Sequence, residues 1–167
     1  KANYTTFNYR LDLNPRVLLN DPKMKGMKKF VSKLNLLSSF QTTKKSVATG
    51  SFEFNPFKYG VSDTALITLS TSILNTLAFN RFSSKWGIDL TNFRNTGKSL
   101  LTYGYESRKI NDWTAKWRWN INRKLALTMS SRMGINALYT PSFANRNYEL
   151  SLFNAEPTLI FIRGTKF

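Results

Sequence analysis

The sequence contains no cysteine and no histidine, and it has few acidic residues. Without thiolate or imidazole groups, the common zinc sites, iron–sulfur clusters, disulfides and all histidine-dependent catalytic triads are excluded. Asp and Glu number 9 against 25 Lys and Arg, which gives a formal net charge of +16 over 167 residues. We therefore expect a strongly basic protein that is not an enzyme, holds no cofactor and attracts polyanions.

Long apolar runs are missing as well. No stretch approaches the roughly 18 apolar residues that a membrane-spanning helix requires, and the first residues lack the apolar core of a signal peptide. The aromatic residues Phe, Trp and Tyr make up 14% of the chain, whereas disordered basic tails are poor in aromatic residues. The length suits one domain. The sequence therefore predicts a single folded unit that buries or embeds its rings.

What the sequence does contain is alternation with a period of two. Along residues 113–121 the odd positions are apolar and the even positions are polar or charged. This pattern is typical of a β-strand whose two faces meet different surroundings. Trp117 and Trp119 fall on one face of the predicted strand, and Lys116 and Arg118 fall on the other.

The same alternation recurs along the chain and predicts an all-β, antiparallel up-and-down meander of about eight strands. The predicted strands are 7–14, 32–42, 65–80, 85–91, 99–106, 113–121, 125–135 and 147–161. We expect tight turns at 95–98 and 122–124, and longer loops at 14–31 and 43–64. In the last strand the apolar residues change from even to odd positions near Pro157, which predicts a β-bulge there. Short connections that alternate with longer loops are typical of transmembrane barrels.

Two environments suit such strands. In a soluble sandwich the apolar face forms a core, whereas in a membrane barrel it contacts lipid and the polar face lines the lumen. Several Trp side chains on one strand face are hard to pack in a core, but they suit the interfacial girdles of a barrel. We therefore favour the membrane barrel and keep the soluble sheet as the alternative.

The membrane interpretation assigns residues to each face. The predicted lipid-facing girdle consists of Trp86, Trp113, Trp117, Trp119 and Tyr148. The predicted basic residues of the lumen are Arg10, Lys33, Lys116, Arg118 and Arg132. Trp113 and Trp119 lie six residues apart, which is roughly 20 Å along a strand and close to the height of the apolar band of a barrel, so we expect them to mark the two girdles.

Several stretches resemble the large outer-membrane β-barrel proteins of the Bacteroidota. They are NTLAFNR (75–81), KWGID (85–89) and KSLLTYGYESR (98–108), with further similarity at 54–57, 146–148 and 156–157. The resemblance implies that residues 1–167 are a segment of a larger transmembrane barrel, incomplete at both ends, in the bacterial outer membrane. It also implies a role in an envelope assembly, with outer-membrane lipid, including lipopolysaccharide, and other envelope proteins as partners.

One short motif is of a different kind. Asp63-Thr64-Ala65 resembles the signal for O-glycosylation of exported Bacteroidota proteins, so Thr64 is a candidate acceptor. The alternative is that these residues simply begin a strand after a loop.

Two functions are consistent with these sequence features. The first is a non-catalytic barrel component with a structural, anchoring or transport role. The second is a soluble β-protein that binds nucleic acid, which the charge of +16 and the interleaved aromatic residues favour. A nucleic-acid platform needs its aromatic and basic side chains on the same face, yet alternation separates Trp117 and Trp119 from Lys116 and Arg118. We therefore expect the barrel component, with no specific nucleic-acid partner.

Overall fold

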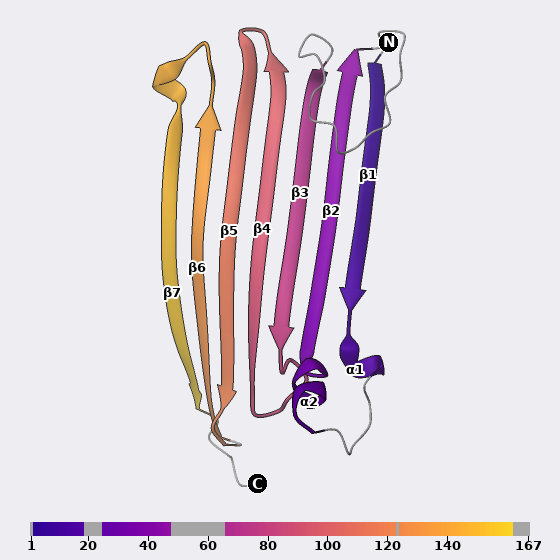
Figure 1. Ribbon diagram of the computed structural model, residues 1–167. Coiled ribbons are helices and arrows are strands. Elements are labelled where there is room, and N and C mark those ends of the chain that lie inside the picture. The colour runs from indigo at the N-terminus through magenta and orange to yellow at the C-terminus, as the bar shows by residue number, and fades with distance from the viewer. Residues whose placement is uncertain (1, 19–24, 48–65, 123, 162–167) are drawn as a thin grey trace, which may run out of the picture.

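A computed structural model describes residues 2–18, 25–47, 66–122 and 124–161, and these form a single β-sheet (Figure 1). Its strands are β1 (Ala2–Leu13), β2 (Leu34–Val47), β3 (Leu66–Phe79), β4 (Trp86–Leu101), β5 (Gly104–Asn120), β6 (Leu125–Tyr139) and β7 (Tyr148–Phe161). Their order in the sheet is their order in the sequence, and every neighbouring pair is antiparallel. The predicted all-β up-and-down meander is confirmed.

The described part of the chain has seven strands instead of about eight, because the turn predicted at 95–98 is wrong. Asn95 and Gly97 lie inside β4 and pair with Ile110 and Arg108 of β5. The hairpin turn instead joins Leu101 to Gly104, where φ is +121°, a conformation that favours glycine. Pairing along the sheet has overridden the turn-like composition of 95–98, so three predicted strands become two long ones.

The bulge predicted near Pro157 is also absent. β6 and β7 pair without interruption from Leu125 opposite Phe161 to Leu138 opposite Tyr148. The apolar residues of β7 therefore change from one face of the sheet to the other. The register shift that the described strands do show lies in β2, between Lys45 and Ser46.

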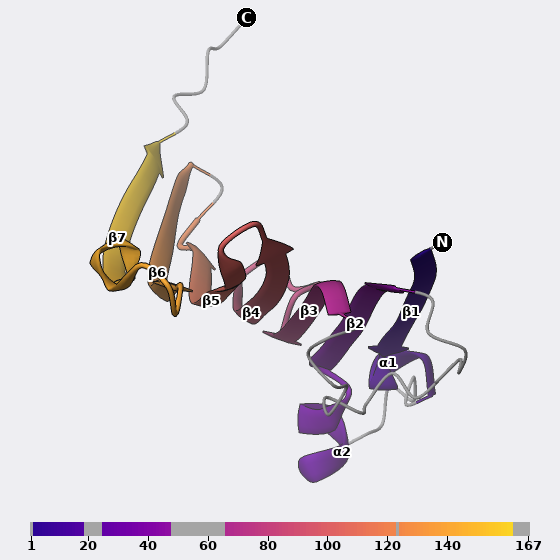
Figure 2. The same cartoon turned by 90° about the horizontal axis from the view of Figure 1, so that it is seen from above.

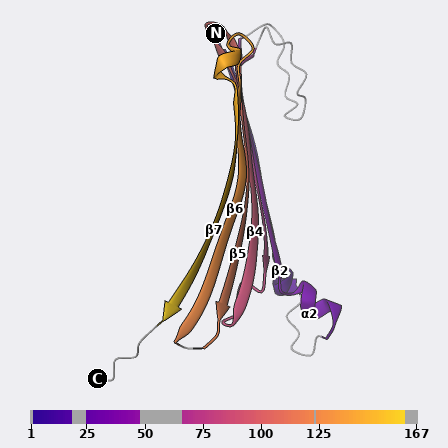
Figure 3. The ribbon, with the colours of Figure 1, turned by 90° about the vertical axis from the view of Figure 1, so that its left-hand side faces the viewer.

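Short helices occupy two of the connections. α1 (Pro15–Leu18) and α2 (Met27–Val31) lie between β1 and β2, within the loop predicted at 14–31, and η2 (Ala144–Arg146) lies between β6 and β7. Figure 3 shows α2 projecting to one side of the sheet. In the loop predicted at 43–64, residues 43–47 belong to β2 and the rest lies outside the described residues. Of the described helices, none has the length and apolar character needed to cross a membrane.

In the described part of the chain the sheet is a single twisted layer, with β1 and β7 as its edge strands. β1 and β7 lie at its opposite sides, as Figure 2 shows from above. Within the described residues the buried apolar side chains are Phe40, Leu66 and Ala78, too few to make a core. We call the end that carries α1 and α2 the lower end and the end that carries η2 the upper end, as drawn in Figure 1.

Candidate membrane-facing surface

The register of the strands divides the side chains between two faces. Residues directly opposite each other in an antiparallel pair project to the same side. Trp86 lies opposite Trp119, Trp117 lies opposite Ile88 and Met129, and Trp113 lies opposite Asn92 and Met133. All four Trp residues of the chain therefore share this side. We call it the tryptophan face. The other side carries Arg10, Arg118 and Arg132, and we call it the arginine face.

One predicted girdle residue does not join the tryptophan residues. Tyr148 pairs with Leu138, which pairs with Arg108, so Tyr148 belongs to the arginine face. The sequence analysis grouped Tyr148 with the tryptophans and predicted a bulge near Pro157, whereas the ladder between β6 and β7 is continuous.

Two of the basic residues predicted to line a lumen have structural partners. The Arg132 guanidinium lies 2.6 Å from Oδ2 of Asp112. Arg118 Nη2 donates hydrogen bonds to the carbonyl oxygens of Arg81 (3.1 Å) and Ser83 (2.9 Å), in the turn between β3 and β4. Arg132 therefore connects β6 to β5, and Arg118 connects β5 to the turn between β3 and β4.

The other predicted residues are distributed as follows. Arg10 and Lys116 lie on the arginine face, Lys33 lies between α2 and β2, and Thr64 lies outside the described residues.

The tryptophan face carries an apolar band that crosses the sheet obliquely. On β1 the uppermost residue of the band is Phe7. The residues paired with Phe7 from strand to strand form a row across the sheet, which contains Lys109 on β5 and Glu149 on β7. On β7 the band begins with Phe153, whose row leads back to Leu11 on β1. The upper border of the band thus drops by four residues from β1 to β7. Strands that are tilted across a flat apolar layer produce such an offset.

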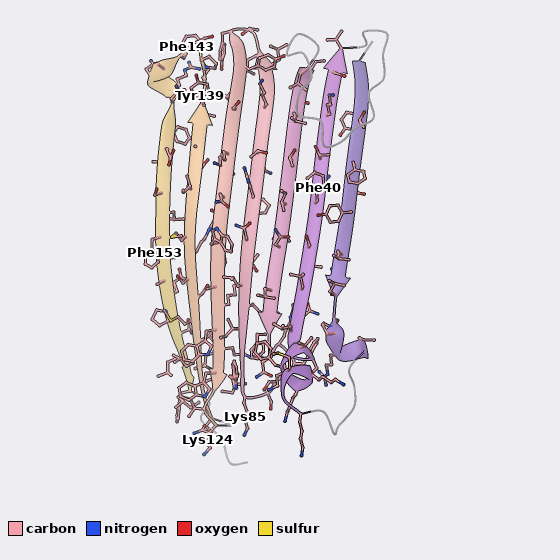
Figure 4. The ribbon with its side chains drawn as sticks, viewed as in Figure 1. Phe40, Lys85, Lys124, Tyr139, Phe143 and Phe153 are labelled. Atoms are coloured by element: carbon pink, nitrogen blue, oxygen red, sulfur yellow. The ribbon has the colours of Figure 1, made fainter. Side chains whose placement is uncertain are left out.

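Within the described residues much of this band is exposed, although Phe40 is buried and Phe30 of α2 contacts Phe79 at the lower end. Phe153 is 72% exposed and Leu159 is 65% exposed on β7, and Trp119 on β5 is 43% exposed. Figure 4 shows Phe153 projecting from β7 at the edge of the sheet. A band of this extent on one face, open to the surroundings, marks a surface for lipid or for a protein partner.

Polar side chains inside the band bond to one another. Ser38 Oγ donates to Asn75 Oδ1 at 2.7 Å, and Asn92 Nδ2 donates to Asn111 Oδ1 at 3.1 Å. These pairs reduce the free-energy cost of placing the polar groups in an apolar medium, because their hydrogen-bonding atoms meet protein partners.

Aromatic rings gather at both ends of the sheet. At the lower end Phe79 lies 4.9 Å from Phe30 of α2 and 5.5 Å from Trp86, between ring centroids. At the upper end Tyr103 meets Phe143 edge to face at 4.8 Å. Figure 4 shows Phe143 and Tyr139 together at that end. The sequence-based interpretation missed this upper group because it placed Tyr103 inside the predicted strand 99–106, whereas Tyr103 lies in the turn between β4 and β5.

Charge is distributed differently on the two faces. On the arginine face the strand cations Arg10, Lys45, Arg108, Lys116, Arg118 and Arg132 are intermixed with Asp12, Asp89, Glu106, Asp112 and Glu156. On the tryptophan face the strand charges are Lys44, Arg94, Lys98 and Lys109 against Glu149. We call those four cations the upper basic cluster, since they lie above the apolar band on the central strands.

A second group of cations lies at the lower end. The described connections there carry Arg16, Lys25, Lys28, Lys29, Lys33, Arg81, Lys85 and Lys124 and no acidic residue. Figure 4 shows Lys85 and Lys124 at this end of the sheet. These side chains are exposed, so solvated turns explain them without a ligand.

The described residues contain no group of acidic side chains arranged to hold a metal ion. Comparisons with protein-family models, with curated proteins and with solved structures find no match to this chain.

Proposed function

We propose that the chain is a non-catalytic segment of a transmembrane β-barrel in the bacterial outer membrane, with a structural, anchoring or transport role in an envelope complex. The observation that supports this most directly is the exposed, oblique apolar band on the tryptophan face. Lipid covers such a band without requiring a second protein layer.

The dimensions of the strands agree with this proposal. A strand tilted at about 45° needs roughly 9 to 11 residues to cross a bilayer, and β4 and β5 have 16 and 17 residues. The excess on these strands carries polar and basic residues above the band, such as Arg94 and Lys109. Long central strands that extend beyond the membrane fit the proposal, since the segment above the band carries Arg94, Lys98 and Lys109.

The edge strands require additional strands under the same proposal. An unpaired backbone N–H or C=O group in hydrocarbon costs several kcal/mol, so β1 and β7 must pair with further strands in the membrane. Those strands come from the same polypeptide or from another. The sheet of seven strands is then an arc of a larger barrel.

The alternative of nucleic-acid binding meets an obstacle in the register. Trp117 shares a face with Ile88 and Met129, whereas Lys116 lies opposite Asp89 and Ser130 on the other face. Bases that stack on Trp117 or Trp119 would therefore find no phosphate contact from Lys116 or Arg118. The basic residue of β5 that shares the tryptophan face, Lys109, is eight residues from Trp117 along the strand.

Because the chain lacks cysteine, a single introduced cysteine can carry a fluorophore that reports the polarity around one chosen position. Ala115→Cys and Lys116→Cys place a polarity-sensitive fluorophore on neighbouring residues of β5, one on each face. After reconstitution in phospholipid vesicles, we expect blue-shifted emission from position 115, quenched by brominated acyl chains, and water-like emission from position 116.

The control measurement is the location of the unlabelled chain in cells. We expect it to sediment with outer membranes and to resist alkaline extraction. Identical emission from positions 115 and 116 in vesicles, or release of the chain by alkali, would overturn the membrane assignment in favour of a soluble sheet.

A further inference from the structure

A hollow lies at the lower end of the sheet, between the turn that joins β3 to β4 and the turn that joins β5 to β6. It has a volume of about 750 Å³. The residues that line it include Lys85, Trp86, Trp119, Ile121, Asn122 and Leu125. We call it the lower hollow. Its lining combines aromatic and aliphatic side chains with an amide and a cation.

Hydrogen bonds between the strand ends hold the walls of the lower hollow in place. Asn120 Nδ2 donates to the carbonyl oxygen of Ser84 at 2.6 Å, and the Asn120 N–H donates to the carbonyl oxygen of Lys85 at 2.6 Å. The Ile121 N–H donates to the carbonyl oxygen of Leu125 at 3.0 Å. These bonds fix the ends of β4, β5 and β6 relative to one another, so the hollow is formed before a ligand enters it.

The aromatic wall of the lower hollow continues the apolar band of the tryptophan face. Trp86 and Trp119 lie directly opposite each other, and Trp119 stacks on Trp117 one step further into the band. Trp119 is 43% exposed and Ile121 is 45% exposed, so a ligand can reach both side chains. A Trp ring offers an apolar surface and one N–H donor, which suits the boundary between hydrocarbon and polar headgroups.

Two cations flank the lower hollow. Lys85 precedes β4 and Lys124 precedes β6, and both side chains are exposed at this end of the sheet (Figure 4). Because β5 lies between those strands, the two backbones are about 10 Å apart, a gap that two lysine side chains can close around one phosphate. Solvation explains such cations one at a time. The hollow with aromatic walls between them is a second observation, and it points to a ligand that carries both a charge and an apolar part.

We propose that the lower hollow binds an anionic phospholipid, with the phosphate between Lys85 and Lys124 and the start of the acyl chains against Trp86 and Trp119. The proposal rests on the membrane location argued above and adds a defined lipid site at one headgroup level. A phospholipid fits better than a free anion because its apolar part contacts the aromatic wall and continues onto the apolar band. Its phosphate at the same time faces the cations of the turns.

The test uses the full chain in neutral detergent micelles at low ionic strength. Phosphatidylglycerol brominated near the carboxyl ends of its acyl chains is titrated while Trp fluorescence is followed, and phosphatidylcholine brominated in the same way is the neutral comparison. We expect tighter apparent binding of phosphatidylglycerol. Trp119→Phe should remove more of the quenching than Trp113→Phe, because Trp113 lies six residues away from Trp119 on β5, toward the upper end.

A double variant tests the two lysines. Lys85→Gln with Lys124→Gln should weaken the binding of phosphatidylglycerol roughly 30-fold, which corresponds to about 1 kcal/mol for each cation near a lipid phosphate. The matched control is Lys45→Gln with Lys116→Gln, which removes the same charge from the arginine face and should leave the affinity unchanged.

Three results would overturn the proposed site. Equal affinity for the two lipids means that the surface recognises acyl chains alone. Equal weakening by the two double variants means that the net charge of the protein attracts the lipid. Displacement of the lipid by millimolar inorganic phosphate means that the hollow binds the free anion. Absence of quenching by either lipid would instead contradict the membrane location, so the failure of the site and the failure of the proposed function are distinguishable.

Discussion

On the arginine face, cations and acids are interspersed across neighbouring strands, whereas on the tryptophan face cations gather above an exposed apolar band. Arg132 on the first face pairs with Asp112, and Arg118 binds two carbonyl oxygens of a turn. On the second face Lys98 and Lys109 lie beside a hollow with apolar walls. The difference is one of arrangement: on one face cations and acids are interspersed, and on the other the cations of β2, β4 and β5 lie together above apolar side chains.

The largest expected effect comes from introducing one positive charge on the tryptophan face and comparing it with the same charge at the neighbouring position on the arginine face. Ser130 and Ser131 are neighbours on β6 and project to opposite sides. Ser131→Arg places a cation inside the apolar band, between Ala115 and Ala155, and should lower the free energy of unfolding in lipid vesicles by about 2 to 4 kcal/mol. Urea titration of the reconstituted protein measures this.

Ser130→Arg is the matched control for that experiment. On the arginine face it lies between Lys116 and Glu156, whose opposite charges offset each other, so we expect a change below about 0.5 kcal/mol. Equal destabilisation by the two variants would contradict the distinction between the faces.

A smaller effect is expected where the arginine face is tightly packed. A Cβ atom added to Gly134 would clash with the Asp112 carboxylate, whose Cγ would lie 3.2 Å away. Gly134→Ala should therefore displace the partner of Arg132 and cost about 1 to 3 kcal/mol of unfolding free energy. In an Asp112→Ala background the same substitution should cost much less.

Gly97→Ala on β4 provides the comparison. The nearest atom to its added Cβ is the Leu69 carbonyl oxygen at 4.0 Å, so no clash results. We expect this variant to be neutral or slightly stabilising, since alanine loses less conformational entropy than glycine on folding. If Gly97→Ala destabilised the protein as much as Gly134→Ala, the clash would not be the cause.

A local effect is expected at Arg118. Arg118→Gln removes the donor to Arg81 and Ser83, which should cost about 1 kcal/mol and speed amide hydrogen exchange in the β3–β4 turn. Lys116→Gln lies two residues away on the same face, and within the described residues Lys116 makes no such bond to a turn. Faster exchange in both variants would argue against an anchoring role of Arg118.

The smallest expected effect is a difference between two substitutions of Trp119, which tests whether lipid or a layer of protein covers the apolar band. Trp119 lies near the lower border, stacked 5.8 Å from Trp117 between ring centroids. At a membrane interface Trp119→Tyr should be tolerated better than Trp119→Leu, by less than about 1 kcal/mol, because Tyr keeps a polar edge. The yield of folded protein in outer membranes compares them. A better yield with Leu would favour a buried protein contact.

Parts of this architecture were predictable from the residues because alternation is a local property of the backbone. A strand projects successive side chains to opposite sides whatever it pairs with, so the separation of Trp117 from Lys116 follows from the sequence. The meander follows as well, since short connections join antiparallel neighbours. Turn-like residues such as Asn95 and Gly97 were misleading, because pairing with β5 holds them in an extended conformation.

The sequence by itself determined the period of the strands, the basic charge and the absence of thiol and imidazole chemistry. The tertiary structure decided the register, and register determines which distant residues become neighbours. Lys44, Lys98 and Lys109 belong to three different strands, and only the ladders between β2, β3, β4 and β5 bring them to one surface. The placement of Tyr148 was decided in the same way, because a shift of one residue in β7 would have moved its side chain to the other face.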